Sequence, residues 1–147
     1  MSKLKWSFDY CSAWNRGTAL YVQWANRHGI SYPRLMVLYA LMTAGEMTQK
    51  EICEGFGLVK QTVNTVVRDL KKNKYIILKA GQADRREKKI SLTGEGRIYA
   101  EKWVNPLLKT QKRIFEIIGC ERMKQMQDTL ELFNILFENE MRGDKQE

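Results

Sequence analysis

The sequence of 147 residues contains one histidine, three cysteines without regular spacing, and only two prolines. A lone His28 and the lack of a Cys-x-x-Cys pair disfavour a zinc site built from cysteine and histidine. The chain also has no phosphate-binding glycine loop and no Gly-x-Ser-x-Gly turn. We therefore expect no metal, no cofactor and no catalytic residues. An enzyme with a cysteine nucleophile is the alternative, but Gly29 follows His28 as at the end of a helix, which argues against a catalytic histidine.

Long apolar runs are also missing. None approaches the roughly 20 residues that a membrane-spanning helix needs, and the first residues lack the apolar core of a signal peptide. We therefore expect no membrane partner and a cytoplasmic protein, which agrees with the few, irregularly spaced cysteines. Few prolines and ten glycines argue against a disordered or fibrous chain, and the length suffices for one domain with its own core.

Positive charge is concentrated in one segment, residues 60–89. The segment holds ten of the 25 basic residues but three of the 17 acidic ones, and therefore carries +7 of the formal net charge of +8. Each lysine or arginine that docks on a phosphate releases condensed counterions, so a concentrated basic element favours a polyanion partner. The order of predicted elements around it favours double-stranded DNA.

Two predicted helices joined by a glycine turn lie at the start of this segment. Thr48 and Glu51 form a capping box that opens a short helix. Gly57-Leu58-Val59 makes a tight turn, and a second helix follows over about residues 60–73. Two helices with this connection indicate a helix-turn-helix motif.

The second of these helices has two chemically different faces. Val63, Val66, Val67 and Leu70 recur at the spacing of one buried face. The opposite face carries Gln61, Thr65, Arg68 and Lys72, flanked by Thr62 and Asn64. An ordinary solvated helix face is the alternative, but such faces usually mix glutamate and lysine. Glutamine, asparagine, threonine and arginine are the side chains that read base edges in the major groove.

A β-hairpin is predicted directly after this helix. Residues 75–79 (Tyr-Ile-Ile-Leu-Lys) are rich in β-branched and aromatic side chains and indicate a strand. Residues 87–92 form the return strand, with Ile90 and Leu92 pointing inward. The connection is polar and carries Arg85 and Arg86. A hairpin here can contact the DNA backbone or place an arginine in the minor groove. The alternative is an ordinary polar hairpin.

Four further helices are predicted outside this core, over about residues 4–28, 31–45, 94–118 and 121–141. Ser31 can cap the second of them. Its predicted buried side chains are Leu35, Leu38, Tyr39 and Met42. Pro106 should kink or break the third, and residues 142–147 should fray. Both ends of the chain are more apolar than a monomer of this size needs, which favours a homodimer.

The chain resembles the MarR family of bacterial winged-helix regulators. The segments that carry the resemblance are, in chain order, Gly29-Ile30-Ser31, Leu35-Met36-Val37-Leu38, Thr48-Gln49-Lys50-Glu51-Ile52, Thr62-Val63, Asp84-Arg85-Arg86 and Ser91-Leu92-Thr93-x-x-Gly96. The resemblance extends over essentially the whole chain, and its centre is the most diagnostic part.

The resemblance implies a mainly α fold with a small β-hairpin wing, in one MarR-like domain of residues 1–147. A winged helix-turn-helix DNA-binding core at about residues 31–93 would be flanked by dimerisation helices at about residues 1–30 and 94–141. Family members are homodimers that bind a pseudo-palindromic operator and usually repress. Two departures concern the ends of the recognition helix: Val59 replaces the usual capping serine or threonine, and Lys74 replaces a glycine. We expect Asn73 to supply the left-handed turn instead.

The resemblance and the residue chemistry together suggest three groups of DNA contacts. The residues expected to read bases are Gln61, Asn64, Thr65 and Arg68. Those expected to touch phosphates are Thr48, Gln49, Lys60, Thr62 and Lys72. Those expected in the wing are Arg85, Arg86 and Lys88, with Asp84 pairing with Arg86 to orient it, as in the family.

Many relatives respond to phenolic or lipophilic acids, so a small aromatic or lipophilic ligand is a further expected partner. The aromatic residues that would line its pocket are Tyr10, Trp14, Tyr21, Tyr32 and Tyr39. Aromatics at this spacing more often pack in a core or dimer interface, which is the alternative. Two other functions stay open: a redox-sensing regulator through Cys11, and a winged-helix module that binds proteins rather than DNA.

Overall fold

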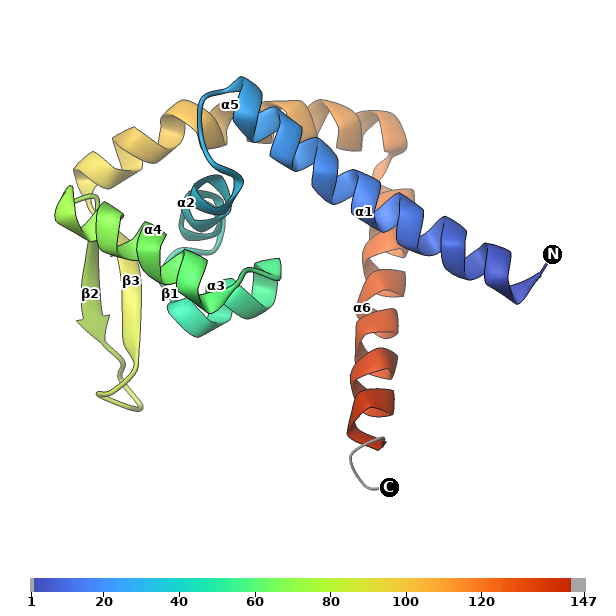
Figure 1. Cartoon of the computed structure of the whole chain (residues 1–147). Helices are drawn as coiled ribbons and strands as arrows, with labels where there is room; N and C mark the ends of the chain where they lie inside the picture. The colour runs from blue at the N-terminus through green and yellow to red at the C-terminus, as the bar shows by residue number, and fades with distance from the viewer. Residues whose placement is uncertain (1, 144–147) are drawn as a thin grey trace. The chain divides into compact units, whose positions relative to one another are not determined.

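The computed structural model describes residues 2–143 (Figure 1). In chain order, the elements are α1 (Lys3–Arg27), α2 (Tyr32–Ala44), β1 (Met47–Thr48), α3 (Gln49–Phe56), α4 (Lys60–Lys72), β2 (Ile76–Ala80), β3 (Lys88–Leu92), α5 (Gly94–Ile118) and α6 (Cys120–Gly143). The predicted fold class, mainly α with a small wing, is confirmed. The chain divides into two compact units, Met1–Pro106 and Leu107–Glu147. Over the described residues, no helix combines the length and apolarity required to cross a bilayer.

The centre of the first unit is α2, which packs against α1, α3, α4 and the strands β1 and β3 (Figure 1). Ser31 caps it, as predicted, and Pro33 lies in its first turn. Because neighbouring elements cover several sides of α2, its buried residues are not confined to one stripe. Six are buried: Leu35, Met36, Val37, Leu38, Ala40 and Leu41. The prediction was wrong for Tyr39 and Met42, which are only half-buried.

The helix-turn-helix is formed by α3 and α4. The predicted capping box is present, because Thr48 Oγ1 accepts from the Glu51 amide (3.1 Å) and the Glu51 carboxylate accepts from the Thr48 amide (2.7 Å). This second bond lowers the pKa of Glu51. Gly57 ends α3 with φ of +59°, a left-handed conformation that glycine adopts without steric strain. The turn then points α4 across the surface of α2 and α3.

The wing belongs to a three-stranded antiparallel sheet with the order β1-β3-β2. Strand β3 pairs with β2 from Ile76↔Leu92 to Ala80↔Lys88, which confirms the predicted hairpin. Strand β1 was not predicted, because two residues carry no periodic pattern; it pairs as Met47↔Ile90. Strand β1 connects the N-terminus of α3 to the wing, so the capping box and the hairpin belong to one sheet.

The junction between α4 and β2 differs from the prediction. Lys74, not Asn73, has the positive φ of +60°, whereas Asn73 has φ of −82°. The amide of Tyr75 donates to the Leu70 carbonyl (2.9 Å), the hydrogen bond that closes the end of a helix around a left-handed residue. Asn73 instead donates from its side chain to the Asp69 carbonyl (2.9 Å). A lysine therefore occupies a conformation that favours glycine.

Replacing Lys74 with glycine should raise the free energy of unfolding by about 1 kcal/mol, because it removes the steric strain of a left-handed side chain. Chemical denaturation at fixed protein concentration measures this change. Lys71→Gly is the matched control: it lies inside the last turns of α4, and glycine there should lower stability by roughly 0.5–1 kcal/mol. A loss of stability in both variants would contradict the assigned conformation of Lys74.

Helix α5 begins at a close contact with the α4–β2 junction. Thr93 Oγ1 accepts from the Gly96 amide (3.0 Å) and donates to the Lys74 carbonyl (2.8 Å), while the Thr93 amide donates to the Tyr75 carbonyl (3.0 Å). Of the kink or break predicted at Pro106, the break does not occur, because the helix continues through this residue. Proline removes one backbone hydrogen bond, and the other bonds of a 25-residue helix continue on both sides of it.

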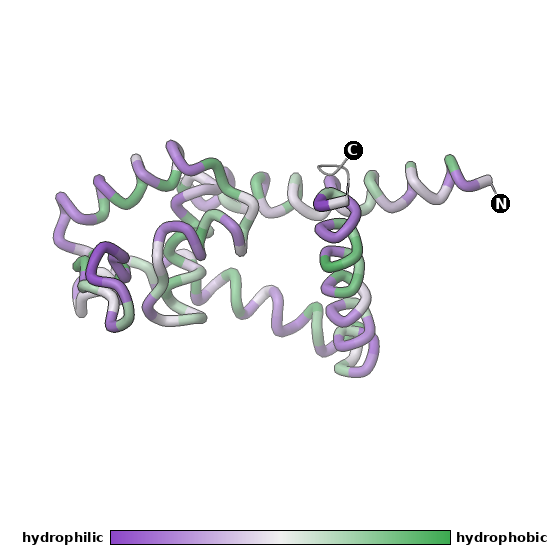
Figure 2. The backbone as a smooth tube through the Cα atoms, turned by 90° about the horizontal axis from the view of Figure 1, so that it is seen from below, coloured by the Kyte–Doolittle hydropathy of each residue, from purple (hydrophilic) through white to green (hydrophobic). Residues whose placement is uncertain are grey.

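The second unit contains the last part of α5 and α6, which meet at Gly119 with φ of +89°. None of the residues of α6 is buried, although apolar and polar residues interleave along it (Figure 2). Its exposed apolar side chains are Met126, Leu132, Phe133, Ile135, Leu136, Phe137 and Met141. Residues 142 and 143 are helical, contrary to the predicted fraying, and residues 144–147 lie outside the described part of the chain.

Candidate nucleic-acid interface

The two predicted faces of α4 are present in the structure. Val63, Val66, Val67 and Leu70 are buried and hold the helix on the first unit. The polar side chains are all exposed: Lys60, Gln61, Thr62, Asn64, Thr65, Arg68 and Lys72. The helix therefore presents a continuous polar and basic surface to solvent. At its start, Val59 forms no capping hydrogen bond and is 69% exposed.

An ion pair that the sequence did not reveal fixes the inner side of α4. Arg34 of α2 pairs through Nη2 with Asp69, and its Nη1 donates to the hydroxyl of Tyr99 on α5 (3.1 Å). Burial alone would lower the pKa of Arg34, but these hydrogen bonds outweigh it and raise the pKa. Tyr99 also stacks on Tyr75 with a centroid distance of 4.1 Å. In the sequence, Arg34 is separated by 35 positions from Asp69 and by 65 positions from Tyr99, so no local pattern indicates these contacts.

The N-terminus of α3 reaches the same surface. Gln49 Nε2 donates to Asn64 Oδ1, so a hydrogen bond between side chains bridges the two helices on their exposed side. Thr48 behaves differently, since it is 4% exposed and its hydroxyl serves the capping box. Of the two residues predicted to touch phosphate here, only Gln49 therefore offers a side chain to solvent.

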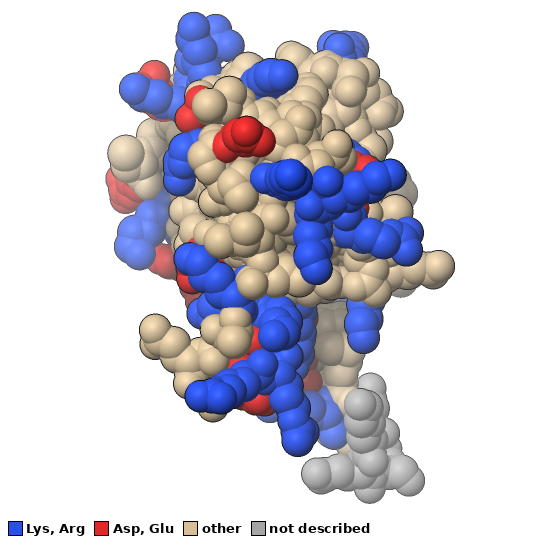
Figure 3. Space-filling view, turned by 90° about the vertical axis from the view of Figure 1, so that its left-hand side faces the viewer, with Lys and Arg blue, Asp and Glu red and all other residues tan. Residues whose placement is uncertain are grey.

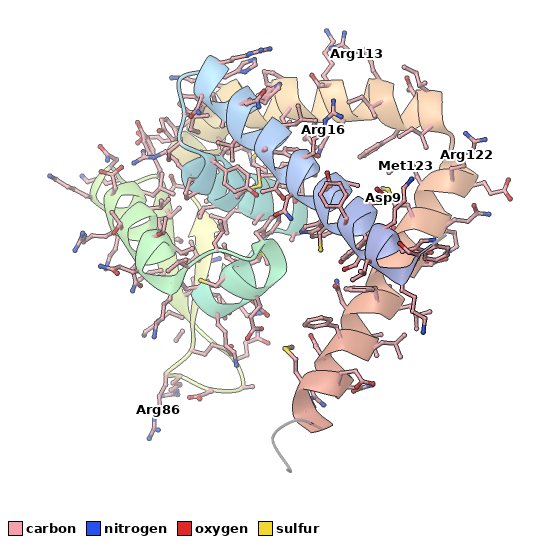
Figure 4. All side chains as sticks on the ribbon, turned by 45° about the vertical axis from the view of Figure 1, so that its right-hand side comes forward. Asp9, Arg16, Arg86, Arg113, Arg122 and Met123 are labelled. Atoms are coloured by element: carbon pink, nitrogen blue, oxygen red, sulfur yellow. The ribbon has the colours of Figure 1, made fainter. Side chains whose placement is uncertain are left out.

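The wing tip carries two exposed arginines, and Arg86 points away from the hairpin (Figure 4). Asp84 Oδ1 accepts from the backbone amide of Arg86 (2.9 Å) rather than from its guanidinium. Within residues 2–143 no ion pair joins the two side chains, so the expected Asp84–Arg86 pair is not formed; the aspartate shapes the turn instead. Gly81 donates to the Glu87 carbonyl (2.7 Å) across the same turn.

Lysines follow the two long strands of the wing. Lys79 lies opposite Lys89, and Lys88 lies opposite Ala80. Lys79 forms an ion pair with Glu46, and its hydrogen bond lowers the pKa of that carboxyl. Lys88 is exposed and forms no ion pair within the described residues. On the face that includes the wing side of α4, lysine and arginine outnumber acidic side chains (Figure 3).

The aromatic residues predicted to line an effector pocket differ in their exposure and in their neighbours. Tyr10 and Trp14 of α1 are exposed. Burial raises the pKa of Tyr32, and the charge of Tyr21 raises it further. Tyr39 instead packs edge-to-face on a phenylalanine of α3, with centroids 6.2 Å apart.

The cysteines and the single histidine have ordinary surroundings. Cys11 and Cys120 are exposed, and Cys53 is half-buried. In the described part of the chain, no three histidine, cysteine or acidic side chains gather in a way that could hold a metal ion. His28 is the C-cap of α1, as predicted, and its ring stacks on Trp24 at 3.7 Å.

A helix-turn-helix followed by a hairpin wing, on a three-stranded sheet with α2 behind it, defines a winged-helix protein. A model of the MarR family matches residues 28–87, which include α2, the helix-turn-helix and the wing. Together with the similarity to relatives given below, this match places the winged-helix core, residues 28–87, with the MarR family of transcriptional regulators. That family comprises regulators rather than enzymes.

Three relatives illustrate the similarity. The MarR family regulator NMB1585 from Neisseria meningitidis is 27% identical, with a TM-score of 0.83 over 98% of this chain and 99% of that one. The uncharacterized HTH-type transcriptional regulator YwoH of Bacillus subtilis is 33% identical over 86 residues, which cover 58% of this chain and 62% of YwoH. BpsR of Bordetella bronchiseptica, whose DNA binding is regulated by 6-hydroxynicotinic acid, shares the fold at 21% identity and a TM-score of 0.61, over 87% and 91% of the chains.

Proposed function

We propose that this chain is a sequence-specific regulator that binds double-stranded DNA as a homodimer and represses transcription from a pseudo-palindromic operator. The observation that carries the proposal is the outward face of α4. Its buried face anchors the helix, and the exposed one carries glutamine, asparagine, threonine and arginine, the side chains suited to base edges in a major groove. The chain acts without catalysis, in the cytoplasm, where operator DNA is accessible.

The exposed residues divide into base-reading and backbone-positioning groups. The base-reading group is Gln61, Asn64, Thr65 and Arg68. The positioning group on the helix-turn-helix is Gln49, Lys60, Thr62 and Lys72. Wing contacts come from Arg85, Arg86 and Lys88, which extend the basic surface beyond the recognition helix. Basic side chains on both elements support one continuous phosphate-binding surface.

The exposed apolar residues of α1 and of α6 support the dimer. Trp6, Phe8 and Trp14 on α1 are at least half exposed, and α6 buries none of its residues. Apolar faces of this extent mark interaction surfaces rather than ordinary solvent-facing helices. A twofold dimer places its two recognition helices in successive major grooves, about 34 Å apart.

A small aromatic or lipophilic acid would act as the effector. The regulation of BpsR by an aromatic acid supports this ligand class. Such a ligand changes operator affinity only by its differential affinity for two conformations of the dimer. It therefore releases DNA if it prefers a spacing of the recognition helices that does not match two grooves.

Arg68→Ala should weaken binding to a selected operator by about 1–3 kcal/mol and weaken binding to random DNA much less, because the arginine reads a base. Lys88→Ala should weaken binding to both DNAs alike and reduce the slope of affinity against salt, because it neutralises a phosphate. Gel-shift titrations at several salt concentrations measure both effects. Equal losses on the two DNAs for Arg68→Ala would refute its base-reading role.

A protein-binding winged helix is the competing function, and one chromatographic test separates it from the proposal. The DNA-binding surface predicts salt-dependent retention on heparin and a gel shift with duplex DNA. A protein-binding module predicts neither.

A further inference from the structure

A hydrogen bond between the side chains of Gln49 and Asn64 crosses the exposed side of the helix-turn-helix. Gln49 is the first residue of α3, and Asn64 lies in the second turn of α4. The capping box formed by Thr48 fixes where α3 begins, and therefore fixes the position from which Gln49 extends. Both side chains lie on the surface that carries the proposed base-reading group.

This bond decides which way the Asn64 amide faces. A free asparagine side chain turns about its terminal bond and exchanges its oxygen with its NH2 group. Gln49 Nε2 donates to Asn64 Oδ1, so the oxygen faces α3 in this structure. Oδ1 keeps a second lone pair, and Nδ2 keeps both of its hydrogens. An amide that is already oriented loses less conformational freedom when it binds.

In the major groove only adenine offers an acceptor, N7, beside a donor, N6, and an asparagine amide pairs with both. The oriented Asn64 amide has the matching donor and acceptor still available. We infer that Gln49 is a specificity-determining residue, which positions the Asn64 amide so that the dimer prefers adenine at one position in each half-site. This inference rests on the proposed DNA-binding function and assigns Gln49 a role beyond a phosphate contact.

The test uses the full-length protein and a duplex selected by it from random sequences. Each adenine in turn is replaced by 7-deazaadenine, which pairs normally with thymine but lacks the N7 acceptor. Wild-type protein should lose about tenfold in affinity at one adenine per half-site, within the range of a bidentate base contact. Asn64→Ala should lose this sensitivity, and Gln49→Ala should reduce it to about threefold or less.

Gln49→Glu sharpens the test, because a carboxylate cannot donate to Oδ1 and instead attracts the Asn64 NH2 group. It should abolish the preference for adenine at that position, measured as a ratio of affinities, whatever the change in overall affinity. Glu54→Ala is the matched control: this exposed side chain lies on the same helix as Gln49, pairs with Lys50 and belongs to neither group of proposed DNA contacts. It should leave the sensitivity at that adenine intact.

Thermal unfolding checks that the variants fold, which is expected because Asn64 is exposed and Gln49 lies in the first turn of α3. If the protein binds its operator and no replacement of adenine by 7-deazaadenine lowers the affinity, the inference is overturned and the proposed function still stands. The same holds if Gln49→Ala and Gln49→Glu weaken binding to every base at that position equally, as a phosphate contact would. Absence of binding to any duplex would overturn the proposed function, and this inference with it.

Discussion

Replacing Gly96 with alanine should lower the free energy of unfolding by more than about 4 kcal/mol, among the largest effects of a single substitution. A Cβ at this position would lie 1.8 Å from the Tyr75 carbonyl oxygen and 2.6 Å from its carbon. These are backbone atoms, so no side chain can turn away to relieve the overlap. The start of α5 must move, and the bonds that Thr93 forms at the same junction are lost with it.

Thermal and chemical denaturation at fixed protein concentration measure this effect. Gly94→Ala is the matched control, because it lies two residues earlier in α5 and a Cβ there meets no atom within 4 Å. That variant should stay within about 0.5 kcal/mol of the wild type. Similar stabilities for the two alanine variants would contradict the close approach of α5 to Tyr75.

Leu70→Ala should destabilise the protein by about 3 kcal/mol, within the range of roughly 2–5 kcal/mol for buried leucine-to-alanine changes. Leu70 is fully buried, at 0% exposure, and lies on the face that holds α4 against α2 and α3. Because domains of this size are stable by about 5–15 kcal/mol, the loss is a large share of the total. Operator affinity should fall as the folded fraction falls.

The measurement is denaturant titration together with the gel shift at matched temperature. Val59→Ala is the control, since it also truncates an apolar residue at α4 but from a site that is 69% exposed and forms no capping bond. Alanine and valine are both poor caps, so this variant should change stability by less than about 0.5 kcal/mol. A small effect of Leu70→Ala would mean that α4 is not anchored by its apolar face.

Local sequence signals predicted α4 and its neighbouring elements. The valine spacing, the capping box of Thr48 and Glu51, and the alternation in the hairpin each arise from neighbours within a few residues, and each was confirmed. The signal at Lys74 was interpreted wrongly because asparagine tolerates the left-handed conformation better than lysine. The hydrogen bond from the Tyr75 amide to the Leu70 carbonyl closes the end of α4, and its geometry places the left-handed conformation at Lys74.

Contacts between distant residues could not be predicted. Strand β1 exists because Met47 meets Ile90, and the ion pair of Arg34 with Asp69 depends on how α2 and α4 cross. The continuity of α5 through Pro106 is a further example, because local preference alone favours a break. The hydrogen bond of Gln49 with Asn64 likewise depends on the angle set by the turn at Gly57.

The DNA contacts predicted from the sequence are a proposal, and the structure shows which of these side chains are exposed. Most of them are exposed on α4 and the wing, whereas Thr48 is occupied by the capping box. Asp84 shapes the wing turn through the Arg86 amide instead of orienting the guanidinium. Arg86 is therefore free to follow the DNA backbone or enter the minor groove.

The central claim is that the outward face of α4 meets a duplex groove. The most direct test is a titration of isotope-labelled protein with a selected operator duplex, followed by residue-resolved NMR. The account predicts the largest shifts at the side chains of Gln61, Asn64, Thr65 and Arg68, with further shifts at the wing tip. Shifts confined to α6, or no change at low salt, would contradict it.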